Sequence, residues 1–341
     1  MSLKNLSANR IPNILKNKLL NKRIYNLYKT FEKDFKINES FIVAVSGGPD
    51  SLALAFLTKI YSFKKNLESR YYIVDHKLRR ESTYEAKKVN KILNEFNIKS
   101  KILTWKGKKP KKNLQSLARQ KRYKLLFSEC KKLKIKNLIL GHHIDDSYEN
   151  FFIRIVRGSG LRGLVSFGKN TKINEINLIR PLLEFQKKDL IFISSFVFNF
   201  FIKDPSNEND KFLRIKVRNL ISQLKDVGFD QTKLSLTLKN LKSSNDSIIF
   251  YVKNNKKLNS YFNKKKKELI LNQDFFNQPY DVVFRSLSES IKLIGEKYNL
   301  VRGKKLEKIL KKIQENSLSK ETLGGCVIKK VNQTVILRKE S

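Results

Sequence analysis

One short segment combines the residue types that bind a phosphate group. Ser46–Ser51 reads Ser-Gly-Gly-Pro-Asp-Ser and lies between the apolar run Phe41–Val45 and the helix-favouring Leu52–Lys59. A strand, a glycine loop and a helix in this order present backbone N–H groups and a helix N-terminus to an anion. The spacing differs from that of the Walker loop. A plain turn also uses two glycines but does not require both serines and the aspartate, so we predict a phosphate loop.

A second segment, Gly141–Asn150, places three carboxylates beside two histidines. It begins at the end of a predicted strand and enters a predicted helix, so that Glu149 lies one turn beyond Asp145 and Asp146. Mg²⁺ that accompanies a triphosphate is held by one or two carboxylates, and a cationic amine substrate also needs a carboxylate partner. Ordinary capping, which favours acidic residues at a helix start, is the alternative.

Two basic segments follow. Arg157–Leu164 contains Arg157, Arg162 and three glycines, which suits close approach of the backbone to a nucleotide and contact with its phosphate. A helix C-cap at Gly158 is compatible with that role. The second segment carries three basic candidates for RNA contact on one predicted helix: Arg214, Lys216 and Arg218. A solvated basic surface is the alternative for these three.

The spacing of apolar residues predicts strands and helices that alternate around these segments. Strands are predicted at 41–45, 71–75, 101–105 and 138–141, and helices at 24–37, 52–59, 82–96, 114–133 and 145–156. Strands joined by helices of this length form a parallel, doubly wound α/β sheet, which binds ligands outside the carboxyl ends of its strands. Ser46–Ser51, Asp75-His76 and Gly141–His143 all follow such ends. We therefore expect them at one edge of one sheet.

The composition predicts a nucleic-acid partner. The 341 residues include 72 Lys and Arg against 31 Asp and Glu, which gives a net charge of +41. A charge of this size attracts a polyanion and makes its binding depend strongly on salt. The chain also favours Lys, Asn, Ile and Phe, which A/T-rich codons encode, so codon bias on a solvated surface is the alternative.

The length predicts more than one domain. We expect a basic N-terminal extension at 1–23, a catalytic domain at 24–226, a helical RNA-binding domain at 227–300 and a small α/β domain at 301–341. Within the last of these, the β-like runs Cys326–Val331 and Thr334–Arg338 predict a hairpin.

The cysteines and the apolar runs predict a cytoplasmic protein. Cys130 and Cys326 are isolated, which argues against a disulfide framework, a zinc ribbon or an iron–sulfur cluster. Met1–Leu20 has no continuous apolar core and does not resemble a secretory signal. Leu190–Ile202 is shorter than the roughly 20 residues of a membrane span. We predict that it is a buried helix and that no membrane is a partner.

The motifs resemble those of one enzyme family. Ser-Gly-Gly-x-Asp-Ser resembles the pyrophosphate loop of the ATP-pyrophosphatases, or PP-loop proteins, which split ATP between the α and β phosphates. Further segments, in order along nearly the whole chain, resemble the tRNA(Ile)-lysidine synthetases: Val74–Arg79, Asn113–Arg119 with Arg122-Tyr123, Gly141–Glu149, Arg157–Leu164, Arg180–Leu183, Asp204–Asn207 and Thr322–Cys326. Members of that family join lysine to C2 of the wobble cytidine in a CAU-anticodon isoleucine tRNA, which changes its codon from AUG to AUA, and convert ATP to AMP and pyrophosphate.

The resemblance implies roles for individual residues. The ATP-binding residues would be Ser46, Gly47, Gly48, Pro49, Asp50, Ser51, Asp75 and His76, with Asp50 also placing Mg²⁺. The catalytic residues would be Asp50, His142, Asp146, Glu149, Arg119 and Arg122. Asp146 and Glu149 would bind the substrate lysine, and His142 would lie near the reacting phosphate or base. Arg119 or Arg122 would neutralise the α-phosphate, although either could be a plain helix-surface residue. The tRNA-binding residues would be Arg157, Arg162, Arg214, Lys216 and Arg218.

Three residues depart from the family pattern. Lys77 stands where glycine is usual, Gln115 where glutamate is common, and Ile215 where asparagine often follows the arginine. Two other interpretations compete with a lysidine synthetase. A tRNA thiolase of the same fold would commonly use a cysteine pair or a cluster. A non-catalytic RNA-binding protein would have no reason to keep the acidic and serine side chains of the two motifs: Ser46, Asp50, Asp146 and Glu149.

Overall fold

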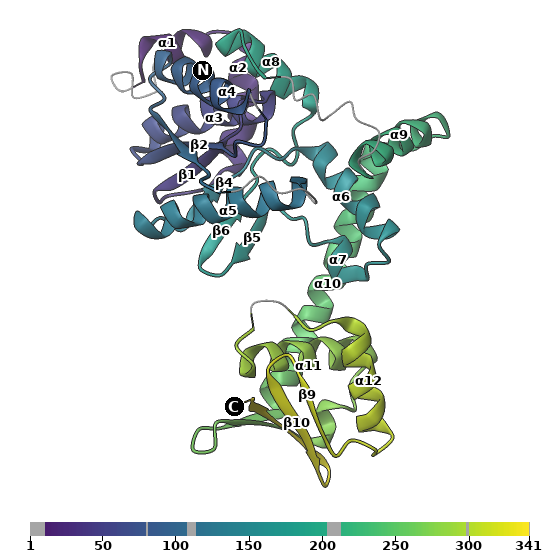
Figure 1. Cartoon of the computed structure of the whole chain (residues 1–341). Helices are drawn as coiled ribbons and strands as arrows, with labels where there is room; N and C mark the ends of the chain where they lie inside the picture. The colour runs from purple at the N-terminus through teal and green to yellow at the C-terminus, as the bar shows by residue number, and fades with distance from the viewer. Residues whose placement is uncertain (1–10, 80, 108–113, 203–212, 298–299, 341) are drawn as a thin grey trace. The chain divides into compact units, whose positions relative to one another are not determined.

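The computed structural model describes residues 11–79, 81–107, 114–202, 213–297 and 300–340. The chain divides into two compact units, an N-terminal unit, Met1–Asp230, and a C-terminal unit, Gln231–Ser341. Both are drawn in Figure 1. The predicted Asp204–Asn207 motif and part of the predicted N-terminal extension lie outside the described residues. No helix in the described ranges is both long and apolar enough to span a membrane.

Within its described residues, the N-terminal unit contains a six-stranded sheet in the order β3-β2-β1-β4-β6-β5. Its strands are β1 (Phe41–Val45), β2 (Ser69–Asp75), β3 (Ser100–Thr104), β4 (Asn137–Ile139), β5 (Asn170–Ile173) and β6 (Ile176–Ile179). All pairs are parallel except β5 with β6, which forms an antiparallel hairpin at the edge. The predicted doubly wound α/β fold is confirmed, and the four predicted strands are β1 to β4.

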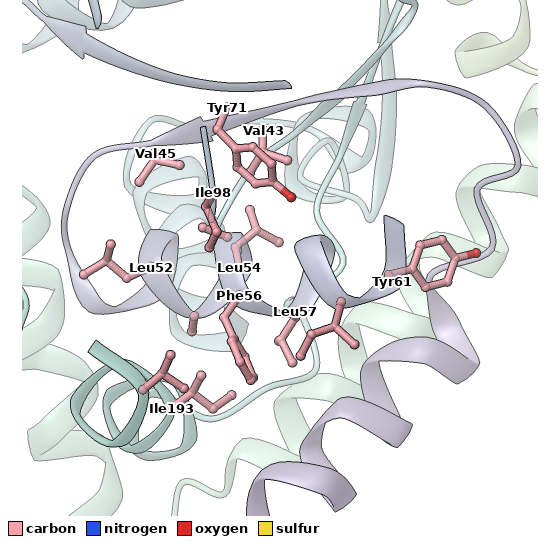
Figure 2. Packing of buried hydrophobic residues seen from close by; sticks show 14 of the residues in the cluster. Val43, Val45, Leu52, Leu54, Phe56, Leu57, Tyr61, Tyr71, Ile98 and Ile193 are labelled. Carbon is pink, nitrogen blue, oxygen red and sulfur yellow. The ribbon is translucent and has the colours of Figure 1, made fainter. Parts of the chain in front are cut away.

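Helices cover both faces of this sheet. One face packs with α1 (Asn13–Lys18), α2 (Lys22–Asp34), α3 (Pro49–Lys65), α4 (Ser82–Glu95) and α8 (Lys187–Phe198), and the other face packs with α5 (Leu114–Lys132). The unit also contains α6 (Ile144–Val156), α7 (Leu161–Leu164) and α9 (Leu213–Asp226). Alternate residues of β1 point to opposite faces. Val43 and Val45 pack with α3, α4 and α8, whereas Ile42 packs with Leu126 of α5. Figure 2 shows the first of these two cores.

The run predicted as one buried helix at 190–202 is shorter in the structure. Its helix, α8, begins at Lys187 and ends at Phe198, because the next residue, Asn199, takes a left-handed conformation with φ of 49°. The chain beyond it leaves the helix, and the N–H of Ile202 donates a hydrogen bond of 2.9 Å to the carbonyl of Gly47. The end of this segment therefore supports the phosphate loop instead of extending the helix.

The C-terminal unit pairs helices with an antiparallel sheet in the order β7-β8-β11-β10-β9. Its elements are α10 (Gln231–Leu258), β7 (Ser260–Asn263), β8 (Glu268–Leu271), a 3₁₀ turn (Gln273–Phe275), α11 (Tyr280–Ile294), α12 (Gly303–Gln314), β9 (Lys320–Leu323), β10 (Cys326–Val331) and β11 (Thr334–Lys339). The predicted hairpin at 326–338 is confirmed as β10 and β11.

The boundary expected between residues 300 and 301 does not separate two domains. β8 pairs with β11, and Leu271 and Leu287 share one buried cluster with Leu306 and Leu337. The region expected to be wholly helical, 227–300, also contributes β7 and β8 to the sheet. Neither part can bury its apolar residues without the other, so the region 231–341 forms one core.

Candidate active site at the carboxyl ends of β1 and β4

The phosphate loop is ordered by the side chain of Ser51. Its Oγ accepts hydrogen bonds of 3.1 Å from the backbone N–H groups of Ser46 and Gly47, and it donates one of 3.0 Å to the carbonyl of Gly48. The Ser46 hydroxyl lies 3.2 Å from the same oxygen. Ser51 therefore shapes the loop from inside.

Glycine is required at the second position of the loop. Gly47 has φ of +87°, and a Cβ there would lie 2.5 Å from Val89 Cγ2 and 2.7 Å from Ile202 Cδ1. Gly48 then caps α3, and Pro49 takes its first position, where a missing N–H leaves no helical hydrogen bond unmade. The N–H groups of a first helical turn have no carbonyl partner within the helix. The start of α3 is therefore a ready anion site beside the end of β1.

Gly141 brings the loop after β4 against the phosphate loop. A Cβ at Gly141 would lie 3.2 Å from the carbonyl carbon and oxygen of Asp50 and from the Cα of Ser51. β2 and β4 lie on opposite sides of β1, so the strand order switches direction between β1 and β4. Open α/β sheets bind ligands at such a switch point. The two segments therefore meet at one edge of the sheet, as their sequence positions predict.

Asp50, the acid of the phosphate loop, is paired with Lys187 at the start of α8. Lys187 Nζ lies 2.7 Å from each of the two carboxylate oxygens. The buried imidazole of His143 also faces this carboxylate, with Nε2 3.8 Å from Asp50 Oδ2 and 3.7 Å from Asp146 Oδ2. His143 therefore lies between the acid of the phosphate loop and an acid of α6.

His142 has surroundings that keep its imidazole neutral. Burial is the largest cause and lowers the pKa of His142 from 6.5 to about 4. The positive charges of Arg180, Arg119 and Arg214 lower the pKa further, and Asp146 opposes them. A neutral imidazole carries one hydrogen-bond donor and one acceptor. His142 therefore offers both at neutral pH, without a charge.

Arg180, which directly follows β6, fixes the wall beside His142. This buried side chain donates from Nη1 to the carbonyl of Gly168 at 2.8 Å and to Thr171 Oγ1 at 2.9 Å. Its guanidinium carbon lies 4.8 Å from the centre of the Phe167 ring, which meets the His142 ring edge-on at 5.2 Å. The arginine thus holds the chain before the β5–β6 hairpin against the imidazole.

Asp146 begins α6 as an ionised carboxylate. Its Oδ2 accepts a hydrogen bond of 2.9 Å from the backbone N–H of His143. Burial acts to raise the pKa of Asp146, but His143, His142 and this hydrogen bond outweigh burial and lower it. The capping role that its position allowed is therefore present, together with a negative charge inside the site.

Glu149 differs from Asp146 because burial outweighs the opposing interactions and raises its pKa. The side chain is 6% exposed, and burial raises the pKa of Glu149 despite a 2.5 Å hydrogen bond from Arg218 Nε. Asp146 raises it further by repulsion. Asp146 and Glu149 thus hold protons with different affinities.

The basic residues of α9 do not share one face. Arg218 pairs with Glu149, and Arg214, one turn earlier, acts electrostatically on Asp146. Lys216 is exposed, but a residue two positions away on a helix does not share their face. Ile215, which departs from the family pattern, is buried at 7% exposure. Arg214 and Arg218 therefore belong beside the carboxylates of α6.

Arg119 is one of the two arginines predicted on α5. Its Nη2 donates to the hydroxyl of Tyr123 at 3.4 Å, and its charge helps to lower the pKa of His142. Arg122 is exposed on the same helix. The electrostatic effect of Arg119 on His142 makes it the better candidate for the α-phosphate contact, and the choice stays a prediction.

Asp75 organises the loop after β2. Its Oδ1 accepts from the backbone N–H of Lys77 at 3.0 Å and from Ser82 Oγ at 2.9 Å, and its Oδ2 accepts from Thr83 Oγ1 at 2.7 Å. His76 Nδ1 accepts from the N–H of Leu78 at 3.3 Å. Asp75 is 2% exposed and holds its own loop through these three bonds, so its side chain shapes the loop. Its contact with ATP stays a prediction.

Lys77, which stands where the family usually has glycine, has a backbone conformation that favours glycine. Its φ is +50°, in the left-handed region that glycine adopts without strain. Lysine tolerates this conformation with a local energetic penalty of about 1 kcal/mol. The departure therefore affects the loop rather than the phosphate-binding residues.

Arg157 and Arg162 lie beyond the far end of α6. Arg157 is the C-cap of α6 and Gly158, with φ of +65°, ends the helix, so the predicted C-cap is confirmed. Arg162 lies on α7, and both arginines are exposed. Arg157 is roughly 16 Å along the helix from Asp146 at 1.5 Å per residue. Arg157 is therefore outside the reach of a reacting group beside Asp146, and both exposed arginines suit contact with a large substrate.

Sequence reasoning missed Lys187, His143 and Arg180 as parts of the site. Lys187 is separated from Asp50 by 137 residues, and no local motif links them. His143 is adjacent to His142, which was predicted as a site residue. Arg180 is the first residue of Arg180–Leu183, one of the segments that resemble the family. The neighbouring motifs were the available signal for these two, whereas the position of Lys187 depends on how α8 packs on α3.

The cysteines offer no reactive thiolate. Cys130 and Cys326 are buried, and burial raises the pKa of each thiol to about 11. The thiolate is the nucleophilic and metal-binding form of cysteine. The structure therefore gives no support to sulfur transfer through these residues.

Comparisons with known proteins agree with this geometry. Residues 17–224 match the family model of the PP-loop domain. The chain is 34% identical over 322 residues to the tRNA(Ile)-lysidine synthase of Orientia tsutsugamushi, covering 90% of this chain and 71% of that protein. It is 32% identical over 330 residues to that of Rickettsia felis, covering 92% and 74%.

A solved structure with the same fold is the U34-tRNA thiolase NcsA from Methanococcus maripaludis with its [4Fe-4S] cluster. The TM-score is 0.55 at 20% identity, covering 64% of this chain and 79% of that one. At this identity the likeness concerns the fold alone. The identities with the lysidine synthases, their coverage and the PP-loop match together show that the chain belongs to the tRNA(Ile)-lysidine synthase family of PP-loop proteins.

Proposed function

We propose that this chain joins lysine to C2 of the wobble cytidine in an isoleucine tRNA with a CAU anticodon. In this reaction the C2 oxygen attacks the α-phosphorus of ATP and releases pyrophosphate. The amine of lysine then attacks C2, and AMP leaves with the former C2 oxygen. One observation carries the proposal: the anion site at the start of α3 and the acidic start of α6 meet at Gly141, where an added Cβ would lie 3.2 Å from the backbone of Asp50.

The phosphate loop supplies the ATP half of the site. Serine hydroxyls hold the loop from inside, and the first turn of α3 presents N–H groups that have no carbonyl partner within the helix. The positive end of the helix dipole would stabilise the pyrophosphate as its bond to the α-phosphorus breaks. Arg119 would face the α-phosphate, where a positive charge stabilises the transition state by several kcal/mol.

The donor groups present fit a magnesium ion carried in with ATP. Mg²⁺ prefers oxygen ligands and is commonly held by one or two carboxylates together with substrate phosphates. Asp50 offers a carboxylate within the phosphate loop, 22% exposed. When bound, Mg²⁺ would neutralise charge on the departing pyrophosphate. The residue we assign to it is Asp50.

The start of α6 supplies the lysine half. The ionised Asp146 would attract the ammonium groups of lysine, and Glu149, whose pKa is raised by burial, would orient the attacking amine. Arg218 already bonds Glu149, so the substrate would share or replace this partner. The neutral His142 can accept a proton from the attacking amine or hydrogen-bond the cytosine.

Transfer RNA is the macromolecular partner that the net charge of +41 favours. Arg157 and Arg162 are exposed, which suits contact with tRNA phosphates. Lys216 is exposed on α9 and suits the same role. We retain the cytoplasm as the predicted location.

The test is the transfer of labelled lysine into RNA. The full chain is incubated with ATP, Mg²⁺, labelled lysine and an isoleucine tRNA transcript that carries a CAU anticodon. We expect label in the RNA and lysine-dependent formation of AMP. A transcript with a changed wobble base is the control. No label in RNA and no lysine-dependent AMP would rule the function out.

A further inference from the structure

Lys187 is the closest cation to the acid of the phosphate loop in the described part of the structure. Its Nζ lies 2.7 Å from Asp50 Oδ1 and 2.7 Å from Oδ2, so the ammonium lies between the two oxygens. The Lys187 side chain is 38% exposed and that of Asp50 is 22% exposed. The pair is therefore open enough for a ligand to reach it.

The backbone that carries Lys187 is fixed against α3. Leu190 and Ile193 of α8 are fully buried in the same cluster as Leu52, Phe56 and other residues of α3. Figure 2 shows Ile193 beside Phe56 in this core. Because α3 also carries Asp50 and the anion site, the start of α8 keeps a constant place beside them. Only the flexible four-carbon stem of Lys187 needs to move.

The ammonium of Lys187 and a magnesium ion would compete for the same carboxylate, that of Asp50. Mg²⁺ coordinates a carboxylate oxygen at 2.0–2.1 Å, and Asp50 cannot hold both cations so closely without strong repulsion between them. A triphosphate at the start of α3 would simultaneously bring negative charge within reach of the lysine stem. The metal would repel the Lys187 ammonium from Asp50, and the triphosphate would attract it. Both effects favour a move of the ammonium from Asp50 to the phosphates.

We propose that Lys187 is a further ATP-binding residue that exchanges partners. Without nucleotide it neutralises Asp50, and when Mg²⁺ and ATP bind, Asp50 passes to the metal and Lys187 to the phosphates. His143, 3.8 Å from Asp50 Oδ2, is the other side chain that faces this carboxylate in the described residues. The inference rests on the ATP half of the proposed function and not on the transfer of lysine.

Two binding measurements on the full chain test the exchange. Mn²⁺, as a probe for Mg²⁺, is titrated without nucleotide and followed by electron paramagnetic resonance. Separately, α,β-methylene-ATP is titrated with Mg²⁺ by calorimetry. Lys187→Met should bind Mn²⁺ at least about threefold tighter, because a competing cation is gone. It should bind the nucleotide about tenfold more weakly, because a charged phosphate contact is lost.

Lys188→Met is the matched control, because Lys188 is the exposed neighbour on the same helix turn. It should change neither affinity. Lys187→Arg keeps a cation beside Asp50 and should leave Mn²⁺ binding near that of the wild type. Circular dichroism and thermal unfolding establish that each variant is folded.

Tighter binding of Mn²⁺ together with weaker binding of the nucleotide distinguishes the exchange from a structural role of Lys187. A folded Lys187→Met protein that binds both ligands more weakly, or behaves like Lys188→Met, would overturn the inference. Failure of the wild-type chain to transfer lysine would leave the binding result standing and contradict only the lysine half of the proposed function.

Discussion

At the scale of single residues, the two adjacent histidines have opposite surroundings. His143 lies between carboxylates, with ring nitrogens 3.5 Å from Asp145, 3.7 Å from Asp146 and 3.8 Å from Asp50. His142 instead lies under the combined effect of burial and three arginines. Adjacent identical side chains therefore differ in their surroundings: His143 lies between the acids, and His142 stays neutral at neutral pH.

The low pKa of His142 predicts a loss of stability in acid. The unfolded chain, with a pKa near 6.5, takes up the proton before the native state, whose pKa is about 4. Protonation of the unfolded chain therefore lowers the free energy of unfolding. The loss is absent above pH 6.5 and grows as the pH falls from 6.5 toward 4, by at most about 1.4 kcal/mol per pH unit. Urea unfolding of wild type and His142→Gln across this range measures it. The wild type should lose stability relative to the variant; a constant difference would contradict the assignment.

The division of roles between Asp50 and Glu149 predicts two different defects. Asp50→Ala should abolish release of pyrophosphate, because it removes the acid that we propose as the Mg²⁺ ligand of the ATP half. Glu149→Ala should chiefly raise the lysine concentration needed for half-maximal transfer, by about tenfold or more. Separate assays of pyrophosphate release and lysine transfer measure each step. Equal loss of both steps in both variants would refute the division.

Motifs could identify the residues that lie close together in sequence. Ser46 to Ser51, His142 and Asp146 all lie in the two loops where their strand ends predicted them. Lys187 could not be found this way, since its partner is 137 residues distant. The role of Asp75 also needed the structure, because its three hydrogen bonds come from the loop that follows it.

At the scale of elements, the site depends on how closely backbone segments approach. Gly47 lies against α4 and against the segment that follows α8, and Gly141 lies against the start of α3. Strand β1 and helix α3 are buried almost throughout, so these approaches are set by a rigid core. A side chain at either glycine would displace the loops on which both halves of the reaction depend.

Gly47→Ala should therefore lower the free energy of unfolding, whereas Gly160→Ala should leave it nearly unchanged. Alanine at Gly47 must adopt φ of +87° and approach Val89 at 2.5 Å, which should lower the free energy of unfolding by about 1–3 kcal/mol. Gly160 has φ of −68° and open space around its Cα. Its substitution should change stability by less than about 0.5 kcal/mol. Denaturant unfolding compares the two, and equal effects would argue against the described loop.

Elements that coincide with a clear apolar run or helical period were predictable, whereas strands without such a run were not. β1 to β4 and the helices between them follow from buried runs and helical spacing. β5 (Asn-Thr-Lys-Ile) and β7 (Ser-Tyr-Phe-Asn) contain no run of apolar residues, and the alternation in β6 extends over only four residues. These strands exist because neighbouring strands pair with them, which is a tertiary effect.

At the scale of the whole molecule, the net charge bears on the binding partner, whereas the apolar cores define the two units. The N-terminal unit contains the site, and the C-terminal unit has a core of its own that joins both parts of the chain on either side of residue 300. The net charge of +41 belongs to the chain as a whole. Composition could predict a polyanionic partner, but the domain boundary depended on pairing between β8 and β11.

Binding of tRNA should weaken steadily with salt. The logarithm of the affinity should fall linearly with the logarithm of the salt concentration, as phosphate contacts release counterions. Arg157→Gln should weaken binding and reduce the slope by about one contact. Filter binding across a salt series measures both quantities. Nucleotide affinity is the control and should be unchanged; an unaltered slope would exclude Arg157 from the interface.

The most direct test of the central claim is to identify the modified nucleoside. After reaction with ATP, Mg²⁺ and lysine, the CAU-anticodon isoleucine tRNA is digested and its wobble nucleoside is analysed by mass spectrometry. We predict cytidine that carries lysine in place of the C2 oxygen, with one AMP and one pyrophosphate formed for each lysine. An unmodified wobble cytidine, or a sulfur-containing nucleoside, would contradict an active site built from the ends of β1 and β4 for adenylation and amination.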